Sequence, residues 1–533
     1  MKRIAASLIG LTFFLSLSPA AQASYITDIG YGTLQDQLGA ATPTGAGVRV
    51  AQVEAPINDV SGGAAPIFMP DPSNGQFIGK TITAINGNSS GNFSGHATGV
   101  GELFYGNGSS IAPGVTQIAS YEANSWINSL STAFGAATTS PNRVANHSWV
   151  GGSGSDPGLG TILRLVDRQV SLNEYIQVVG LTNGLGDSPL LGGSAYNVIS
   201  VGRTDGVHQQ SSVPVSGDPL YGAGRTVPTL VSPQNSTSGA TPVVAAAAAV
   251  LVQTGHEGGL TLSEGSTTIT GVGTIYNAER SETVKAALMA GADRQTFNTS
   301  TDANIADYRS AGHETVNGLD SRYGAGQVNI YNSYRILAGG EQRSFQNGGS
   351  DISSFGFDHG TIGGLSGSGQ TASYFFNAPA GEVSLFASLV WNLDVSNNSQ
   401  LTSRLYNLDL SLFDVTTNSL VASSASLLDN TENLYFKLLL GNRYEMRVTT
   451  NEAGNFLWDY ALAWRIDATP SPVPVPPTAW LFVTGVIGLL LATRATSGTG
   501  ESSRFEVFGT SNQELRTTSH VCRAHASRFT PHA

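Results

Sequence analysis

The sequence predicts an α/β fold with a mainly parallel sheet and flanking helices, followed by an all-β sandwich. From Tyr25 to about Leu337, short apolar runs alternate with helical stretches, which is typical of a parallel sheet covered by helices. The composition changes after Gly339, and apolar residues then alternate with polar ones. Alternation of this kind indicates half-buried antiparallel strands. We therefore expect two folded parts, at residues 24–340 and 345–468.

In the first part, apolar runs place the expected elements. Strands are expected at Gly47–Val53, Tyr175–Val179 and Asn197–Val201. Helices are expected at Ala97–Tyr105, Ser238–Gln253 and Ser281–Gly291, the last with an apolar face formed by Val284, Ala287 and Leu288. Active groups in parallel sheets cluster at the carboxyl ends of the strands, so the residues that follow these strands are the first candidates for a site.

The second part contains several alternating segments. The runs are Val383 to Trp391, Leu408 to Leu412, Tyr444 to Val448 and Tyr460 to Ile466. In each run the large apolar residues share one face, as expected of a strand with one face buried. We interpret residues 345–468 as a β-sandwich domain of accessory type.

Both ends of the chain carry features of targeting segments. Lys2 and Arg3, an apolar core from Leu8 to Leu17, and the small-residue site Ala21-Gln22-Ala23 predict a signal peptide over residues 1–23.

At the other end, a proline-rich linker over 469–478 precedes an apolar segment over 479–494, which we interpret as a terminal membrane helix. Trp480 and Arg494 flank this segment. We assign no structure to 495–533.

Composition excludes some functions. The net charge is −12 and charged residues make up 12% of the chain, so the sequence has no basic footprint for nucleic acid. Cys522 is the single cysteine, which excludes an intrachain disulfide and a zinc site built from several cysteines.

Four polar residues follow or precede the expected core elements. Glu54 ends a buried strand, His96 lies between Gly95 and a small-residue helix, and Asn183 follows a strand in an Asn-Gly turn. Ser238 lies near the start of an alanine-rich helix, with Pro242 expected in the first helical turn, where backbone N–H groups lack intrahelical partners.

Each of these residues also has a structural interpretation. Glu54 can be a surface residue at a strand end and His96 a surface or capping residue. Asn183 can be a turn residue, and Ser238 can be the N-cap of a core helix.

Together, the four residues supply the groups needed for acyl transfer. His96 can accept the proton of the Ser238 hydroxyl, and Glu54 can orient and stabilise the imidazolium. The Asn183 amide can donate to a developing oxyanion. The chain order acid, His, Ser is one of the known orders for this chemistry.

These motifs resemble those of the subtilisin-like serine peptidases, the subtilase family. The resemblance covers about residues 45–337 and rests on segments in the family order: Gly47–Glu54, Gly95–Gly101, Ser110–Val115, Asn146–Gly152, Asn183, Asn197–Gly202, Ser236–Ala245 and Tyr323–Asn329. It implies a subtilisin-like sheet, a triad of Glu54, His96 and Ser238, and Asn183 in the oxyanion hole. It also implies substrate binding by Ser148, Trp149, Val150 and Gly151.

The resemblance has departures. Glu54 stands where the family has Asp, so its carboxylate is one methylene further from the backbone; Asp59 is a nearby alternative acid. The serine and histidine motifs also differ from the family at Gly99, Ser236, Gly239, Thr241 and Val243. No cofactor is expected. Calcium is common in the family, but no contiguous acidic loop assigns a site, and the other histidines of the folded part, His147, His208, His256, His313 and His359, lack ligand-type spacing.

The C-terminal end resembles the PEP-CTERM type of sorting tail in its variant with alternating prolines, carried by Val473-Pro474-Val475-Pro476 and the following apolar segment to Arg494. This resemblance implies processing by an exosortase at a bacterial envelope, although the chain continues well beyond Arg494.

The sequence thus predicts an exported, envelope-sorted serine endopeptidase, transiently anchored in the membrane, that acts on protein or peptide substrates. The alternative is a catalytically weak or inactive peptidase-like surface protein that binds peptides or matrix.

Overall fold

A computed structural model describes residues 24–468 except 61, 89–90, 132–137, 153–157, 187–190, 301, 365–369, 397, 399, 451 and 453–454. The predicted signal peptide, proline-rich linker, terminal membrane helix and tail lie outside the described residues and stay predictions. The described residues belong to one compact unit.

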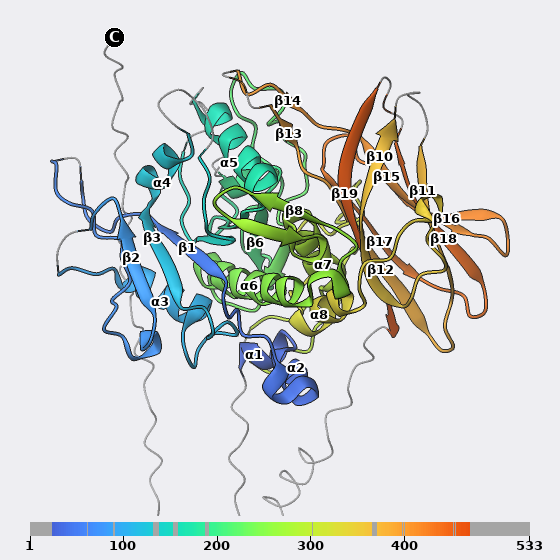
Figure 1. Cartoon of the computed structure of the whole chain (residues 1–533), viewed down its shortest axis with the longest axis horizontal. Helices are drawn as coiled ribbons and strands as arrows, with labels where there is room; N and C mark the ends of the chain where they lie inside the picture. The colour runs from blue at the N-terminus through green and yellow to red at the C-terminus, as the bar shows by residue number, and fades with distance from the viewer. Residues whose placement is uncertain are drawn as a thin grey trace, which may run out of the picture. The chain divides into compact units, whose positions relative to one another are not determined.

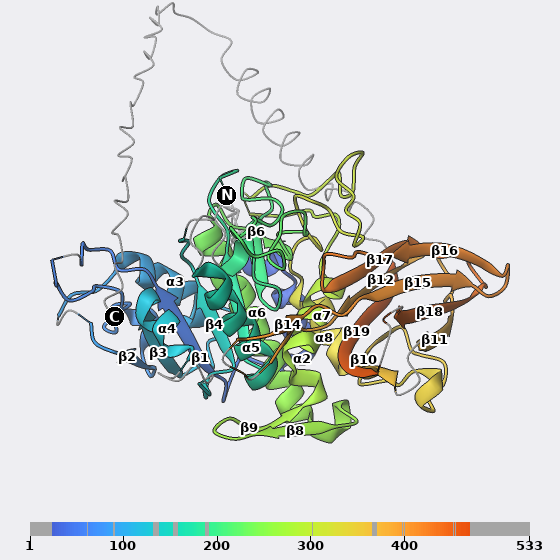
Figure 2. The same cartoon turned by 90° about the horizontal axis from the view of Figure 1, so that it is seen from above.

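A seven-stranded sheet, parallel throughout, forms the first half of this unit (Figure 1). Its strands run in the order β2-β3-β1-β4-β5-β6-β7, and Figure 2 shows the succession from β2 to β4. The strands are β1 Arg49–Glu54, β2 Thr81–Ile85, β3 Gln117–Glu122, β4 Val144–His147, β5 Ile176–Gly180, β6 Ile199–Arg203 and β7 Leu230–Ser232. The predicted fold class is confirmed, because helices cover this sheet and antiparallel sheets follow it.

The strands β4 and β5 at the centre of the sheet are buried over their whole length, as expected for parallel strands covered on both faces. The larger helices are α3 Gly95–Tyr105, α5 Leu159–Asn173, α6 Thr237–Leu262, α7 Ser281–Gly291 and α8 Ile330–Ala338. Smaller elements are α1 Tyr25–Asp28, α2 Tyr31–Leu38, α4 Ala123–Ser129, β8 Ser266–Ile269, β9 Gly273–Tyr276, β13 Asp394–Val395 and β14 Ser403–Arg404.

Helix α6 is the central helix of this core. It packs against α3 and against β4, β5 and β6, and its alanine-rich sequence lets these elements approach closely. Among the described residues it is the one helix long and apolar enough to cross a membrane, but 89% of its most apolar window is buried inside the protein. Its apolar character is therefore explained by its place in the core.

The start of α6 differs from the expectation in two ways. Ser236, not Ser238, is the N-cap, because its Oγ accepts a hydrogen bond from the Gly239 N–H at 3.1 Å. Pro242 is the sixth helical residue rather than part of the first turn. A proline there cannot donate to the carbonyl four residues earlier, so the helix leaves the Ser238 carbonyl without that bond.

Two four-stranded antiparallel sheets form the β-sandwich. One sheet has the order β10-β19-β12-β17 and the other β11-β18-β15-β16. The strands are β10 Phe355–Gly364, β11 Thr371–Asn377, β12 Val383–Val390, β15 Leu408–Asp414, β16 Ser419–Ser424, β17 Thr431–Lys437, β18 Arg443–Thr450 and β19 Phe456–Ala468. The four predicted strands of this region are confirmed as elements.

The expectation of half-buried strands is correct for β15, where buried and partly buried residues alternate, but wrong for β12, where every residue is buried. The reason is that the outer face of its sheet packs against α7, which contacts β10, β12 and β19 (Figure 1). Every residue of α7 is buried for the same reason, although the sequence predicted one apolar face.

Arg465 of β19 links the sandwich to the end of α7. Its guanidinium donates to the Ala290 carbonyl at 3.0 Å and to the Ala292 carbonyl at 3.1 Å, and it lies 3.6 Å from the centroid of the Phe386 ring. Burial lowers the pKa of Arg465 to about 10, so the side chain is charged at neutral pH. A cation at the C-terminal end of a helix is favourable because the last carbonyls lack intrahelical donors.

We expect Arg465→Met to lower the free energy of unfolding by about 3 kcal/mol, because two buried carbonyls lose a charged donor. The matched control is Arg443→Met in the same sandwich. Arg443 pairs with Asp351 at the surface, so its loss should cost below about 1 kcal/mol. Urea unfolding of the two variants measures both values, and equal losses would contradict the role of Arg465.

Candidate active site

Glu54 and His96 form a hydrogen-bonded pair at the end of β1. The Glu54 side chain is buried, and its Oε2 lies 2.9 Å from His96 Nδ1. His96 is the second residue of α3, whose N-cap Ser94 accepts from the Ala97 N–H at 3.1 Å. The His96 side chain is 45% exposed. One imidazole nitrogen is thus held by a buried carboxylate, on a ring that remains accessible to solvent.

Gln52 holds the other oxygen of the Glu54 carboxylate. Its Nε2 donates to Glu54 Oε1 at 2.9 Å and to the Ala97 carbonyl at 2.8 Å, and its Oε1 accepts from the Tyr105 hydroxyl at 2.5 Å. Gln52, Glu54 and Tyr105 are all buried. The extra methylene of Glu54 is therefore accommodated within a bonded network that connects β1 to both ends of α3.

Gln52 is a residue that the sequence analysis missed. A signal for it was present, because Gln52 lies two residues before Glu54 in a buried strand and therefore on the same face. A buried glutamine needs hydrogen-bond partners, so its place beside a buried carboxylate predicts a bond between them.

The two partners affect each other's protonation. Burial raises the pKa of Glu54, and the hydrogen bonds from His96 and Gln52 oppose this rise. The hydrogen bond to Glu54 raises the pKa of His96 above its ordinary 6.5, against the smaller effect of burial. The anionic form of Glu54 therefore depends on its two donors.

Ser238 is joined to Ser148, which directly follows β4. The Ser148 Oγ donates to the Ser238 carbonyl at 3.1 Å. This bond replaces the helical hydrogen bond that Pro242 cannot donate, because proline has no backbone N–H. The Ser238 hydroxyl faces the Ser148 carbonyl at 3.5 Å. Asn146 Nδ2 donates to the Ser148 Oγ at 3.0 Å, so the end of β4 fixes the start of α6.

Asn183 lies beside the same helix start. Its Oδ1 accepts from the Thr237 N–H at 2.8 Å and lies 3.1 Å from the Thr237 hydroxyl oxygen. With its oxygen held in this way, the amide of Asn183 presents its NH2 group away from Thr237. The N–H of Ser238 belongs to the first turn of α6 and has no intrahelical acceptor. Two donors are therefore available next to the serine.

Gly180 at the end of β5 allows helix α6 to pack closely against this strand. A Cβ at Gly180 would lie 2.8 Å from the Thr241 Oγ1 of α6, closer than side chains tolerate. The Thr237 hydroxyl also donates to the Leu181 carbonyl at 2.6 Å. The segment that carries Asn183 is thereby fixed against the helix that carries Ser238.

The structure places all four predicted residues at the carboxyl edge of neighbouring strands β1, β4 and β5. The structure pairs Glu54 with His96. Among the residues it describes, it has no hydrogen bond between His96 and Ser238. Hydrogen bonds of catalytic groups are often long without substrate and tighten in the complex. Asp59 is exposed, and the contact with His96 Nδ1 comes from Glu54.

The predicted substrate-binding segment follows β4 without regular structure. Trp149 is half-buried and its ring lies 6.0 Å from that of His147 in an edge contact, whereas Val150 is exposed. Extended peptides can bind to segments of this kind through backbone hydrogen bonds. Its role in binding stays a prediction.

Comparison with known proteins gives structural similarity only. No known family model and no curated protein matches the sequence. Solved structures with some similarity include the prenylagaramide maturation protease PagA, with 19% identity and a TM-score of 0.29 over 54% of this chain and 92% of that one. The self-cleaved protease domain of PatA has 17% identity and a TM-score of 0.31 over 55% of this chain and 97% of that one.

A cold-adapted subtilisin-like serine proteinase has 20% identity and a TM-score of 0.24 over 39% of this chain and 77% of that one. All three similar structures are proteases, and the third is of the subtilisin-like type that the sequence motifs resemble. At these identities and TM-scores the likeness carries no argument about activity. A function for this chain has to rest on the geometry of its own residues.

We expect the pKa of His96 to lie above 6.5 and to fall in Glu54→Gln, because the variant removes the carboxylate that stabilises the imidazolium. Titration of the histidine NMR signals, assigned with His96→Ala, measures both values. His208 is an internal control, because burial lowers its pKa to about 4 independently of Glu54. An unchanged His96 pKa in Glu54→Gln would contradict the pairing.

We expect Gln52→Met to destabilise the protein more at pH 7 than at pH 5. The variant removes a donor and raises the pKa of Glu54 further, and a carboxyl group with a raised folded-state pKa loses stability as pH rises through that pKa. Gln177→Met on β5 is the control. Gln177 contacts His147, which has a pKa of about 4 and is neutral at both pH values. Denaturant unfolding at the two pH values measures the difference, and a pH-independent loss for Gln52→Met would contradict it.

Proposed function

We propose that this protein is a serine endopeptidase that hydrolyses peptide bonds with a triad of Glu54, His96 and Ser238. The observation that carries the proposal is the buried Glu54 carboxylate, bonded to His96 Nδ1 at 2.9 Å and to Gln52 at 2.9 Å. A carboxylate held in this way fixes the imidazole with Nε2 free to accept a proton. A surface histidine with a merely structural role does not need such a costly partner.

In the proposed reaction the Ser238 hydroxyl attacks the scissile carbonyl while His96 Nε2 accepts its proton. Glu54 stabilises the imidazolium that forms. The Asn183 NH2 and the Ser238 N–H stabilise the oxyanion of the tetrahedral intermediate. His96 then donates its proton to the leaving amine, and water hydrolyses the acyl-enzyme by the same steps.

In this proposal the substrate is a protein or peptide in an extended conformation along Ser148 to Gly151. We also propose, from the sequence features at the two ends, that the enzyme is exported. In this proposal an exosortase-type enzyme sorts it at the envelope through the membrane helix at 479–494. No cofactor takes part.

A non-catalytic surface protein that binds peptides is the second candidate. The observation that favours it is the orientation of the Ser238 hydroxyl, which faces the Ser148 carbonyl at 3.5 Å rather than His96. In that case Glu54 and His96 would only stabilise the fold. The reactivity of Ser238 distinguishes the two functions.

We expect a fluorophosphonate probe to label the wild-type protein at Ser238 and to label neither Ser238→Ala nor His96→Ala. Asn183→Ala should lower kcat on a peptide substrate about 100- to 1,000-fold, because one oxyanion donor is lost. Mass spectrometry of the labelled peptide and steady-state kinetics measure these effects.

Ser236→Ala is the matched control for this experiment. It removes a serine two residues away and should cost about 1 kcal/mol of stability through loss of the N-cap, but it leaves the Ser238 hydroxyl in place. It should therefore still be labelled. A wild-type protein that is folded and not labelled would favour the binding protein over the peptidase.

A further inference from the structure

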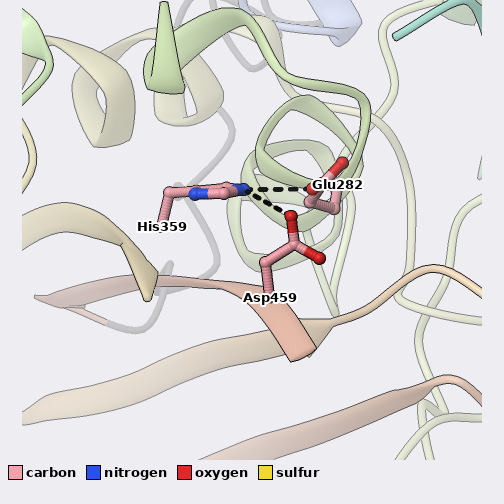
Figure 3. Close-up of side chains that lie close together, drawn as sticks. All are labelled: Glu282, His359 and Asp459. Atoms are coloured by element: carbon pink, nitrogen blue, oxygen red, sulfur yellow. Dashed lines mark hydrogen bonds and ion pairs between the residues drawn. The ribbon is translucent and has the colours of Figure 1, made fainter. Parts of the chain in front are cut away.

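A cluster of three possible metal ligands lies between α7 and the β-sandwich, apart from Ser238 and its partners. Glu282 in the first turn of α7, His359 of β10 and Asp459 of β19 direct their side chains toward one point (Figure 3). His359 Nε2 lies 3.0 Å from Glu282 Oε1 and 3.8 Å from Asp459 Oδ2. One ligand atom from each residue lies within 4.8 Å of the others.

The distances fit a shared ion better than a shared proton. The Nε2 of His359 carries at most one hydrogen, and the 3.8 Å separation from Asp459 is too long for a hydrogen bond. A proton on Nε2 therefore serves only Glu282. Zinc at about 2.0–2.1 Å from each ligand in a tetrahedron places the ligand atoms about 3.3 Å apart, which lies between the two observed distances.

Neighbouring residues orient the carboxylate of Glu282. Its Oε2 accepts from the Asn392 amide at 3.0 Å and lies 2.7 Å from the Ser281 Oγ, whose single hydrogen is shared with Glu174 at 2.8 Å. These bonds leave Oε1 directed toward His359 (Figure 3). Metal-binding carboxylates are commonly oriented by such outer hydrogen bonds.

The balance of charge also favours a cation. Arg280 interacts electrostatically with Glu282, but its guanidinium donates to Glu174 at 3.0 Å. Glu282 is almost fully buried and Asp459 is 38% exposed, and both face the single imidazole of His359. Two carboxylates carry more negative charge than one imidazole can compensate, so a divalent cation would be favourable between them. The exposed side of Asp459 gives an ion and a water molecule access.

We propose that Glu282, His359 and Asp459 bind one Zn²⁺ ion, with water as the fourth ligand. Imidazole together with carboxylates suits zinc, whereas calcium prefers oxygen ligands alone. The ion would join the first turn of α7 to β10 and β19 and would stabilise the contact between them. Because its ligands come from residues far apart in the sequence, no ligand spacing around His359 could predict it.

The test is zinc binding by the full chain at pH 7.5 after treatment with EDTA. We expect one zinc per chain by elemental analysis, and a melting temperature that rises with zinc concentration. His359→Ala and the more conservative Asp459→Asn should both lose this response. Asn392→Ala should weaken zinc binding about 10- to 100-fold, as removal of an outer hydrogen bond does elsewhere.

The matched control is His256→Ala. His256 also pairs with a glutamate, Glu279, at 2.9 Å, but it lies outside the cluster and is 59% exposed. This variant should bind zinc as the wild type does.

Equal zinc binding by wild type, Asp459→Asn and His359→Ala would overturn the proposal. So would a wild-type melting temperature that responds to pH near the His359 pKa but not to zinc, since that result would assign the cluster to a protonated ion pair. Neither measurement uses peptidase activity. A negative result for the zinc site would therefore leave the proposed triad untouched, and the reverse also holds.

Discussion

The arrangement of the candidate active site depends on one buried carboxylate. An ionised carboxylate inside a protein costs several kcal/mol unless hydrogen bonds and an opposite charge compensate for it. Glu54 is 1% exposed, and the compensation comes from Gln52 on its own strand and His96 on the next helix. Gln52 in turn needs Tyr105 as a donor. The same bonds that make the fold tolerate Glu54 therefore also hold the imidazole that the proposed chemistry needs.

The start of α6 satisfies a second constraint. The core requires an apolar helix, and Pro242 within it removes the donor for the Ser238 carbonyl. A helix carbonyl without a donor is unfavourable, and the Ser148 hydroxyl supplies one. The position of Ser238 relative to β4 is therefore set by backbone hydrogen bonding before any substrate binds. This pre-organisation can hold Ser238, the proposed nucleophile, in a defined place at the start of α6.

Strands β1, β5 and β6 could be predicted because the segments Gly47–Val53, Tyr175–Val179 and Asn197–Val201 are mostly apolar. The buried strand β4 could not, because half of it is Asn146 and His147. The positions of Glu54 and Asn183 followed from the rule that polar residues at strand ends meet at one edge of a parallel sheet, whereas Ser238 was indicated by the small residues around it and the apolar helix that follows. Gln52 could not be found by this rule, because it lies inside β1 rather than at its end. The double burial of β12 could not be predicted, since alternation describes one buried face and the second face is covered by α7.

That double burial changes how the β-sandwich should be understood. α7 has an anionic Glu282 in its first turn and the cation of Arg465 at its last carbonyls, and both charges are favourable for a helix dipole. Arg465 comes from β19, and the apolar face that contains Phe386 lies against the same helix. Without the sandwich, α7 would expose its second apolar face and lose the donor at its C-terminal end. Since α7 also packs against α6, the helix that carries Ser238, the sandwich completes the core around the candidate site rather than adding a separable module to it.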